Sequence, residues 1–110
     1  MKLPNGQRAV VELARLSDYC LNEQHPRGRH KARVFASALG ITREDAEVLR
    51  RRLLDAAAEE DVALRERDDY GQRYVLDFLM TGPRGSATVR SVWMVSTNQQ
   101  TPRLLTCYVL

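Results

Sequence analysis

The fold of this chain is decided by residues 73–97, which read RYVLDFLMTGPRGSATVRSVWMVST. Residues 73–80 alternate as a half-buried strand does, with Tyr74, Leu76, Phe78 and Met80 on one face. The next segment, TGPRG at residues 81–85, combines two glycines with a proline and predicts a tight turn. Residues 88–97 then contain the unbroken apolar run VWMV, which predicts a central strand covered on both faces.

Two further strands flank this pair. Residues 62–67 alternate ahead of the turn sequence DDYG at 68–71, and residues 103–110 follow a turn at 98–102. Only short turns separate the four predicted strands. This arrangement is typical of an antiparallel meander.

Helical periodicity precedes the strands. One helical face is formed by Val34, Phe35, Ala38 and Leu39, and Gly40 is suited to end that helix. An imperfect capping box, Thr42 with Asp45, predicts the start of a second helix, whose buried stripe is Ala46, Leu49, Leu53 and Ala57. A shorter helix is expected within residues 13–21, after a short strand at 9–11.

The fold class is therefore α+β, with N-terminal helices followed by a four-stranded antiparallel β-meander packed on them. A chain of 110 residues supports a single domain, which we expect to span residues 1–110. The expected core joins side chains of the two longer helices to one face of the sheet: Val34, Phe35, Leu39, Leu49 and Leu53 against Tyr74, Leu76 and Phe78.

Composition indicates a soluble globular protein, with 44% hydrophobic and 28% charged residues. No apolar run reaches the roughly 18 residues of a membrane span, and the polar start lacks the apolar core of a signal peptide. We expect a cytoplasmic protein without a membrane partner. Cys20 and Cys107 are predicted to be buried, reduced thiols in preference to a disulfide. The spacing of the two cysteines does not match a metal site, and the chain contains no glycine-rich phosphate loop. The sequence therefore predicts neither a metal nor a cofactor.

The charges are divided unevenly along the chain. Residues 1–42 carry seven Lys or Arg against three Asp or Glu, residues 43–69 carry six against ten, and residues 70–110 carry four against one. If the two basic ends meet in the fold, they form a positive surface suited to an anionic partner. A solvated face without a partner is the alternative.

The segment HPRGRHKARVF at residues 25–35 holds both histidines of the chain and four basic side chains. Histidine transfers protons near neutral pH, and a lysine beside it is suited to hold a phosphate. We take His25, His30 and Lys31 as candidate catalytic residues, and Arg27 and Arg29 as groups that attract the substrate. The alternatives are structural: His25 caps the loop before Pro26, and Lys31 covers Phe35 with its aliphatic stem.

Arg90 is the fourth candidate catalytic residue, because a cation in a central strand needs a partner or a ligand. An ion pair with Asp77 is the alternative. The hydroxyls of Ser96 and Thr106 are candidate phosphate donors, and Tyr108 is a candidate to stack a base. Trp93 is assigned to the core.

The pattern LN at residues 21–22, HP-x-G-x-x-KA from His25 to Ala32, and ALGIT at 38–42 resembles an uncharacterised bacterial domain family. That family occurs alone and fused to the C-terminal ends of secreted polymorphic toxins and phage head-morphogenesis proteins. Segments YG at 70–71, GP-x-G at 82–85, VRSVW at 89–93 and TPRL at 101–104 resemble it too, so the resemblance covers nearly the whole chain.

A more distant resemblance concerns architecture alone. Helices followed by a four-stranded antiparallel sheet are also found in the barnase, EndoU, colicin and RelE group of small ribonucleases, many of them toxins. This resemblance implies metal-independent cleavage of RNA by its 2′-hydroxyl, with a general base, a general acid and cations for the developing charge. A fold alone does not carry a function.

Two hypotheses follow. The first is a toxin-type ribonuclease in which Lys31 and Arg90 hold the phosphate of RNA while His25 or His30 transfers protons. The second is a non-catalytic interaction module of a toxin or phage-related system, whose basic loop binds nucleic acid or an acidic protein such as an immunity or antitoxin protein. The oligomeric state stays open. The four candidates around one concavity would favour the enzyme, and candidates that point apart would favour the module.

Overall fold

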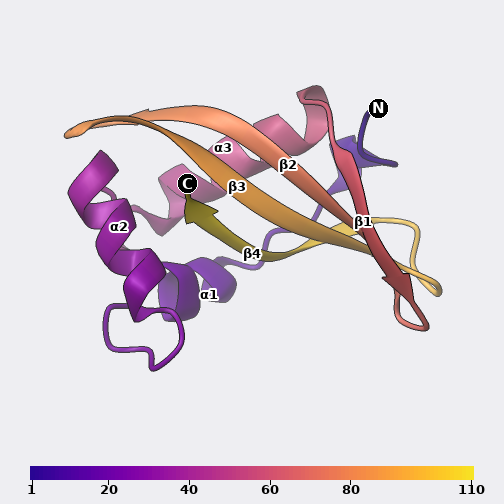
Figure 1. Ribbon diagram of the computed structural model, residues 1–110, viewed down its shortest axis with the longest axis horizontal. Coiled ribbons are helices and arrows are strands. Elements are labelled where there is room, and N and C mark those ends of the chain that lie inside the picture. The colour runs from indigo at the N-terminus through magenta and orange to yellow at the C-terminus, as the bar shows by residue number, and fades with distance from the viewer.

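Four strands form one antiparallel sheet in the order β1-β2-β3-β4 in the computed structural model, which describes residues 1–110 (Figure 1). Each strand therefore pairs with its neighbour in sequence, as the meander requires. The predicted α+β fold class is confirmed. The strand bounds are β1 (Ala63–Asp68), β2 (Gly71–Gly82), β3 (Gly85–Ser96) and β4 (Pro102–Val109).

The helices are confirmed as well. Helix α2 (Arg29–Leu39) ends at Gly40, whose φ of 72° lies in the left-handed region that glycine adopts without strain. The capping box before α3 (Ala46–Glu59) is formed, because Asp45 accepts hydrogen bonds from the backbone N–H (2.9 Å) and hydroxyl (3.2 Å) of Thr42. The shorter elements are η1 (Gly6–Arg8), α1 (Leu13–Arg15), η2 (Leu16–Cys20) and η3 (Arg43–Asp45).

The turn between β2 and β3 rests on the end of α2. The backbone N–H of Arg84 in the turn donates to the carbonyl oxygen of Leu39 at 3.1 Å. A Cβ on Gly82 would lie 2.2 Å from that same carbonyl oxygen, so only glycine permits this approach. The predicted turn therefore reverses the chain and also fixes α2 against the sheet.

The core lies between the helices and one face of the sheet. Phe35, Leu39, Leu49 and Leu53 are fully buried there, with Tyr74, Leu76 and Phe78 from β2 against them. Val34 was expected in this core, and that expectation is wrong: its side chain is 41% exposed. It lies one position before Phe35, about 100° round the helix, and so points away from the core.

The opposite face of the sheet has no covering layer. Trp93 is completely buried, and its indole N–H donates to the Ser91 hydroxyl at 2.9 Å. Val92 and Met94, which point the other way, remain only half-buried. The prediction that residues 92–95 are covered on both faces is therefore wrong, because the helices all pack on one side.

The strand expected at residues 9–11 is reduced to a single bridge, in which Val10 pairs in parallel with Arg103. A fifth strand beyond β4 is therefore absent along most of the length of β4. No helix of the chain is long and apolar enough to cross a membrane.

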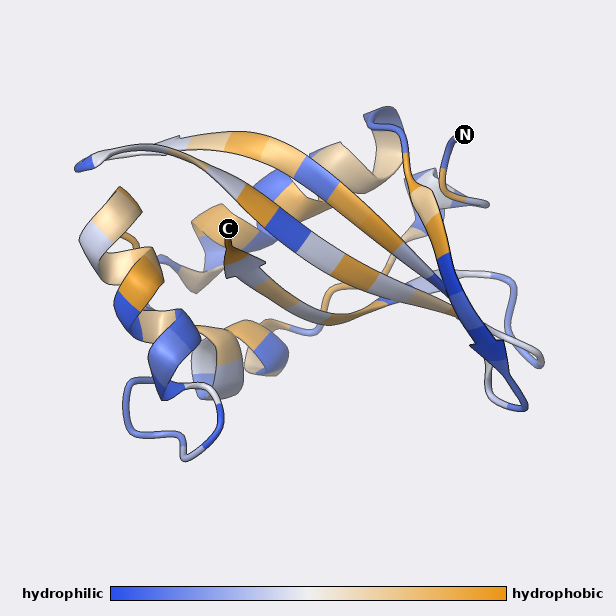
Figure 2. Cartoon of the chain, viewed as in Figure 1, coloured by the Kyte–Doolittle hydropathy of each residue, from blue (hydrophilic) through white to orange (hydrophobic).

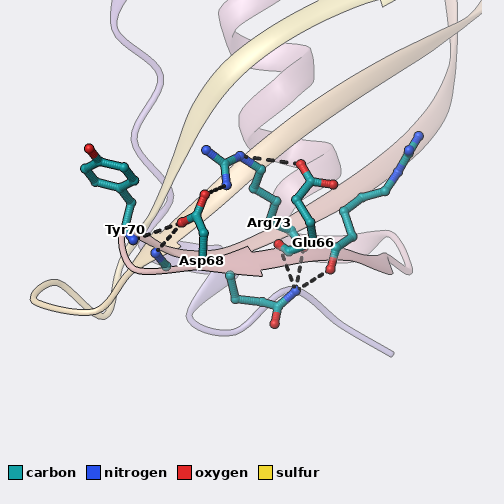
Figure 3. A network of polar contacts seen from close by, with 7 residues as sticks. Glu66, Asp68, Tyr70 and Arg73 are labelled. Carbon is teal, nitrogen blue, oxygen red and sulfur yellow. Dashed lines mark hydrogen bonds and ion pairs between the residues drawn. The ribbon is translucent and has the colours of Figure 1, made fainter.

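The turn between β1 and β2 lies at the end of the sheet opposite α2 (Figure 1). Asp68 accepts hydrogen bonds from the backbone N–H groups of Tyr70 (2.9 Å) and Gly71 (3.3 Å), as a turn-forming aspartate does. Its other oxygen accepts from Arg73 at 2.6 Å, and Arg73 also contacts Glu66 (Figure 3). The positive charge of Arg73 is thus neutralised by two acidic side chains of β1.

Candidate functional site

The loop before α2 is held by one of the candidate histidines. Nδ1 of His25 accepts hydrogen bonds from the backbone N–H groups of Arg27 and Gly28, both at 3.0 Å. An accepting Nδ1 assigns the ring hydrogen to Nε2. His25 therefore caps its own loop, which was the structural alternative for this residue, and its Nε2 carries a hydrogen that can be donated. The loop and the first turn of α2 are hydrophilic, whereas the later turns of the helix are more apolar (Figure 2).

Tyr19 connects this loop to Lys31. The ammonium of Lys31 donates to the Tyr19 hydroxyl at 3.1 Å, and the Tyr19 ring meets the His25 ring edge-on with centroids 4.9 Å apart. Gly28 is buried against the same residue, since a Cβ there would lie 2.1 Å from the Tyr19 carbonyl oxygen. One tyrosine from η2 thus positions both candidates.

Lys31 lies between two tyrosines. Its ammonium is 5.2 Å from the ring centroid of Tyr19 and 5.8 Å from that of Tyr108 on β4. Cation–π contacts of this kind hold a charge without neutralising it. No carboxylate forms an ion pair with Lys31. Its positive charge therefore remains available to an anion.

A groove of about 360 Å³ opens between α2 and β4 at this point. His30 and Lys31 line it from the helix, and Tyr108 and Val109 line it from the strand. Val34 forms the remaining wall, which explains why this apolar side chain is exposed. We call this the lysine groove.

His25 lines a second groove, of about 400 Å³, on the other side of Tyr19. The four candidate catalytic residues therefore do not surround one concavity. His30 and Lys31 share the lysine groove, His25 lies in the neighbouring groove, and Arg90 lies beyond Tyr108 on the sheet.

Arg90 has the partner that the alternative named. Its Nε and Nη2 donate to the two carboxylate oxygens of Asp77, each at 2.8 Å. This pairing lowers the pKa of Asp77 and raises the pKa of Arg90. Tyr108 lies directly opposite Arg90 in the register of β3 and β4. Tyr108 therefore lines the lysine groove, whereas Arg90 beside it does not.

The remaining candidates divide into two groups. Arg27 and Arg29 are exposed and form no ion pair, and the same is true of Arg33 on the next turn of α2. Ser96 lies far from α2, opposite Gly71, where its hydroxyl accepts from the backbone N–H groups of the following turn. The Thr106 hydroxyl lies 3.9 Å from the thiol of Cys20. Neither hydroxyl residue lines the lysine groove.

Beneath the two tyrosines lie the two cysteines, both buried and both free. Cys20 follows Tyr19 and Cys107 precedes Tyr108, so the fold brings the thiols together. A hydrogen bond from Cys107 lowers the pKa of Cys20 to about 7, against the opposing effect of burial. The same interaction and burial raise the pKa of Cys107. Cys20 is therefore the first of the two thiols to lose its proton.

Tyr19 is the residue of this site that the sequence did not indicate. Its neighbours in η2 carry no motif, and its position near Leu16 and Cys20 suggests only part of an apolar helix face. The contact with Lys31 arises from the packing of η2 beside α2, which local periodicity does not specify. A tyrosine next to a buried cysteine was the only signal available.

The fold of this chain is similar to that of a solved structure. A chain of the contact-dependent growth inhibition toxin–immunity protein complex from Klebsiella pneumoniae 342 has a similar fold, with a TM-score of 0.71 at 16% sequence identity. The similarity covers 92% of this chain and 99% of that chain. No curated protein matches the chain in sequence. Residues 2–110 match the family described as domain of unknown function (DUF6883), and the chain belongs to this family.

Proposed function

We propose that this chain is a metal-independent, RNA-cleaving domain of the toxin type, with the lysine groove as its reaction centre. The observation that carries the proposal is Lys31: a cation with no carboxylate partner, held by Tyr19 and Tyr108 in an open groove beside His30. A structural lysine would be expected to pair with an acid or extend into water. This one is fixed in place by the Tyr19 hydroxyl and has no carboxylate partner.

RNA supplies the nucleophile in this chemistry. Attack of the 2′-hydroxyl on the adjacent phosphorus forms a bond to phosphorus and breaks the bond to the 5′-oxygen of the next nucleotide. A general base removes the proton of the 2′-hydroxyl, and a general acid returns a proton to the leaving oxygen. Negative charge develops on the phosphate oxygens and is stabilised by a fixed cation.

The residues of the lysine groove match these tasks. Lys31 stabilises the phosphate charge, because two of its three N–H groups remain after the bond to Tyr19. His30 lines the same groove and transfers one proton. The Tyr19 hydroxyl, in contact with the Lys31 ammonium, transfers the other. Arg27, Arg29 and Arg33 attract the flanking phosphates of the chain.

The likeness in fold to a chain of a toxin–immunity protein complex supports placing this domain in a toxin system. It also supports an immunity or antitoxin protein as a partner. An acidic surface on that partner would match the unpaired arginines at the start of α2.

A second candidate function is the non-catalytic interaction module. It is favoured by the fact that two of the four candidate catalysts have structural partners: His25 holds its own loop and Arg90 holds Asp77. In this case the basic loop binds nucleic acid or an acidic protein without cleaving it.

Incubation of the purified protein with total RNA and tRNA in EDTA, from pH 5 to 9, separates the two functions. Cleavage that Lys31→Ala and His30→Ala abolish supports the enzyme. Binding of RNA without cleavage at any pH overturns it in favour of the module.

A further inference from the structure

We propose that the second groove, in front of Tyr19 and His25, is a binding subsite for the nucleotide next to the scissile phosphate. This inference rests on the proposed function and assigns a substrate position to the groove that lies beside the lysine groove. Its volume of about 400 Å³ falls within the range of small-molecule sites in proteins, about 300–1,000 Å³.

The two grooves adjoin each other across a single side chain. Tyr19 lines the second groove and also accepts the hydrogen bond of Lys31, which lines the first. A nucleic acid chain whose phosphate contacts Lys31 therefore passes Tyr19 within one nucleotide. The neighbouring nucleotide is then directed into the second groove.

The lining of this groove suits a nucleotide better than a bare anion. Tyr19 and His25 present two aromatic rings at 77° to each other, and a base stacks on such rings irrespective of its sequence. His25 carries its ring hydrogen on Nε2, because Nδ1 accepts from the backbone. That hydrogen is a donor for a base or sugar oxygen.

The charges at the rim are paired with one exception. Arg103 is bonded to Glu12, and Arg43 donates to Asp18 at 2.9 Å. Arg15 lines the groove, is exposed and forms no ion pair, so it is available to a phosphate. One free cation beside two rings matches one nucleotide, with a phosphate at one end and a base at the other.

The test measures binding with an RNA that cannot be cleaved. A fluorescein-labelled trinucleotide, 2′-O-methylated at every position, lacks the attacking hydroxyl, and its Kd is measured by fluorescence anisotropy. Two further trinucleotides each lack one terminal base. The variants are Arg15→Ala and, as a matched control, Arg51→Ala, which removes an exposed, unpaired arginine of α3 outside both grooves.

We expect Arg15→Ala to raise the Kd by about fivefold or more and Arg51→Ala to leave it unchanged within about twofold. Loss of one of the two terminal bases should raise the wild-type Kd by about fivefold or more, the effect of one lost stacking contact. The inference is overturned if Arg15→Ala binds as Arg51→Ala does, or if neither terminal base matters.

Failure of the subsite is distinguishable from failure of the proposed function. If the wild type cleaves RNA in a Lys31-dependent manner but Arg15→Ala binds normally, the subsite alone is wrong. If the trinucleotide binds in an Arg15-dependent manner but no RNA is cleaved, the catalytic proposal is wrong and the groove remains a nucleotide-binding site.

Discussion

Arg90 and Asp77 face each other across β2 and β3, and two hydrogen bonds of 2.8 Å join the guanidinium to both carboxylate oxygens. The pair lies midway along the paired strands β2 and β3. Because Tyr108 separates Arg90 from Lys31, the pair keeps one cation next to the lysine groove but neutralised.

Replacing Asp77 should therefore strengthen RNA binding. Asp77→Asn removes the charge that neutralises Arg90 and leaves a free guanidinium beside Tyr108. One additional phosphate contact steepens the slope of log K against log salt for single-stranded RNA by about 0.7. Binding isotherms at several salt concentrations measure this slope, with Asp77→Asn/Arg90→Ala as the control that should restore it. An unchanged slope would mean that Arg90 does not reach the nucleic acid.

Catalysis should depend on the lysine groove. Lys31→Ala and His30→Ala are each expected to lower the rate of RNA cleavage by about 10²–10⁴-fold, the range for lost charge stabilisation or proton transfer. Melting temperatures should stay close to that of the wild type, because His30 is exposed and Lys31 is half-buried. Gel assays in EDTA report the rates. Retained cleavage in both variants would remove the lysine groove from the mechanism.

The core can be tested with two residues that the sequence assigned to it. Leu53 is fully buried, and Leu53→Ala should cost about 2–5 kcal/mol of unfolding free energy. Val34 is 41% exposed, and Val34→Ala should cost about half a kcal/mol or less. Urea melts of both variants give the two values. Equal losses would contradict the orientation of α2.

The thiol pair predicts a stability that changes with pH. The folded-state pKa of Cys20 is about 7, below its ordinary value of 9.0, so the unfolded chain binds more protons between these values. The free energy of unfolding should therefore increase as pH rises from about 7 to 9. This gain is lost as pH falls from 9 through 7. Above pH 9 the raised pKa of Cys107 acts in the opposite direction.

Urea melts at pH 6.5, 8 and 9, with thiolate absorbance near 240 nm recorded in parallel, measure this effect. Cys20→Ser should remove both the rise in stability and the absorbance change near pH 7. A wild-type thiolate signal that appears only above pH 9 would contradict the lowered pKa of Cys20.

Local patterns predicted the elements because each is determined by its own residues. The turn at residues 81–85, the capping box of Thr42 and Asp45, and the alternation from Tyr74 to Met80 all specify structure within a few positions, and all are found. Local patterns could not predict that only one face of β3 is covered. Whether Val92 and Met94 are covered depends on where the helices pack, and no periodicity encodes the absence of a second layer.

The candidate site was predictable only in part for the same reason. Histidines and basic residues in one segment drew attention to the start of α2, and the Asp77 partner of Arg90 followed from charge alone. The role of Tyr19, the two grooves and the meeting of Cys20 with Cys107 depend on how η2, α2 and β4 pack together. The contact of Cys20 with Thr106, for example, joins residues 86 positions apart, and no sequence motif spans that distance.

The meander also determines the order in which the chain can assemble. Pairing of β2 with β3 closes a loop of only two residues, whereas the contact of Cys20 with Thr106 closes one of 86 positions. Loop-closure entropy grows with length, so local hairpins are favoured early and distant contacts late. We therefore expect the β2–β3 hairpin to form early and the η2–β4 contacts beneath the lysine groove to form late. The groove that we propose as the reaction centre is therefore completed only when the two ends of the chain have come together.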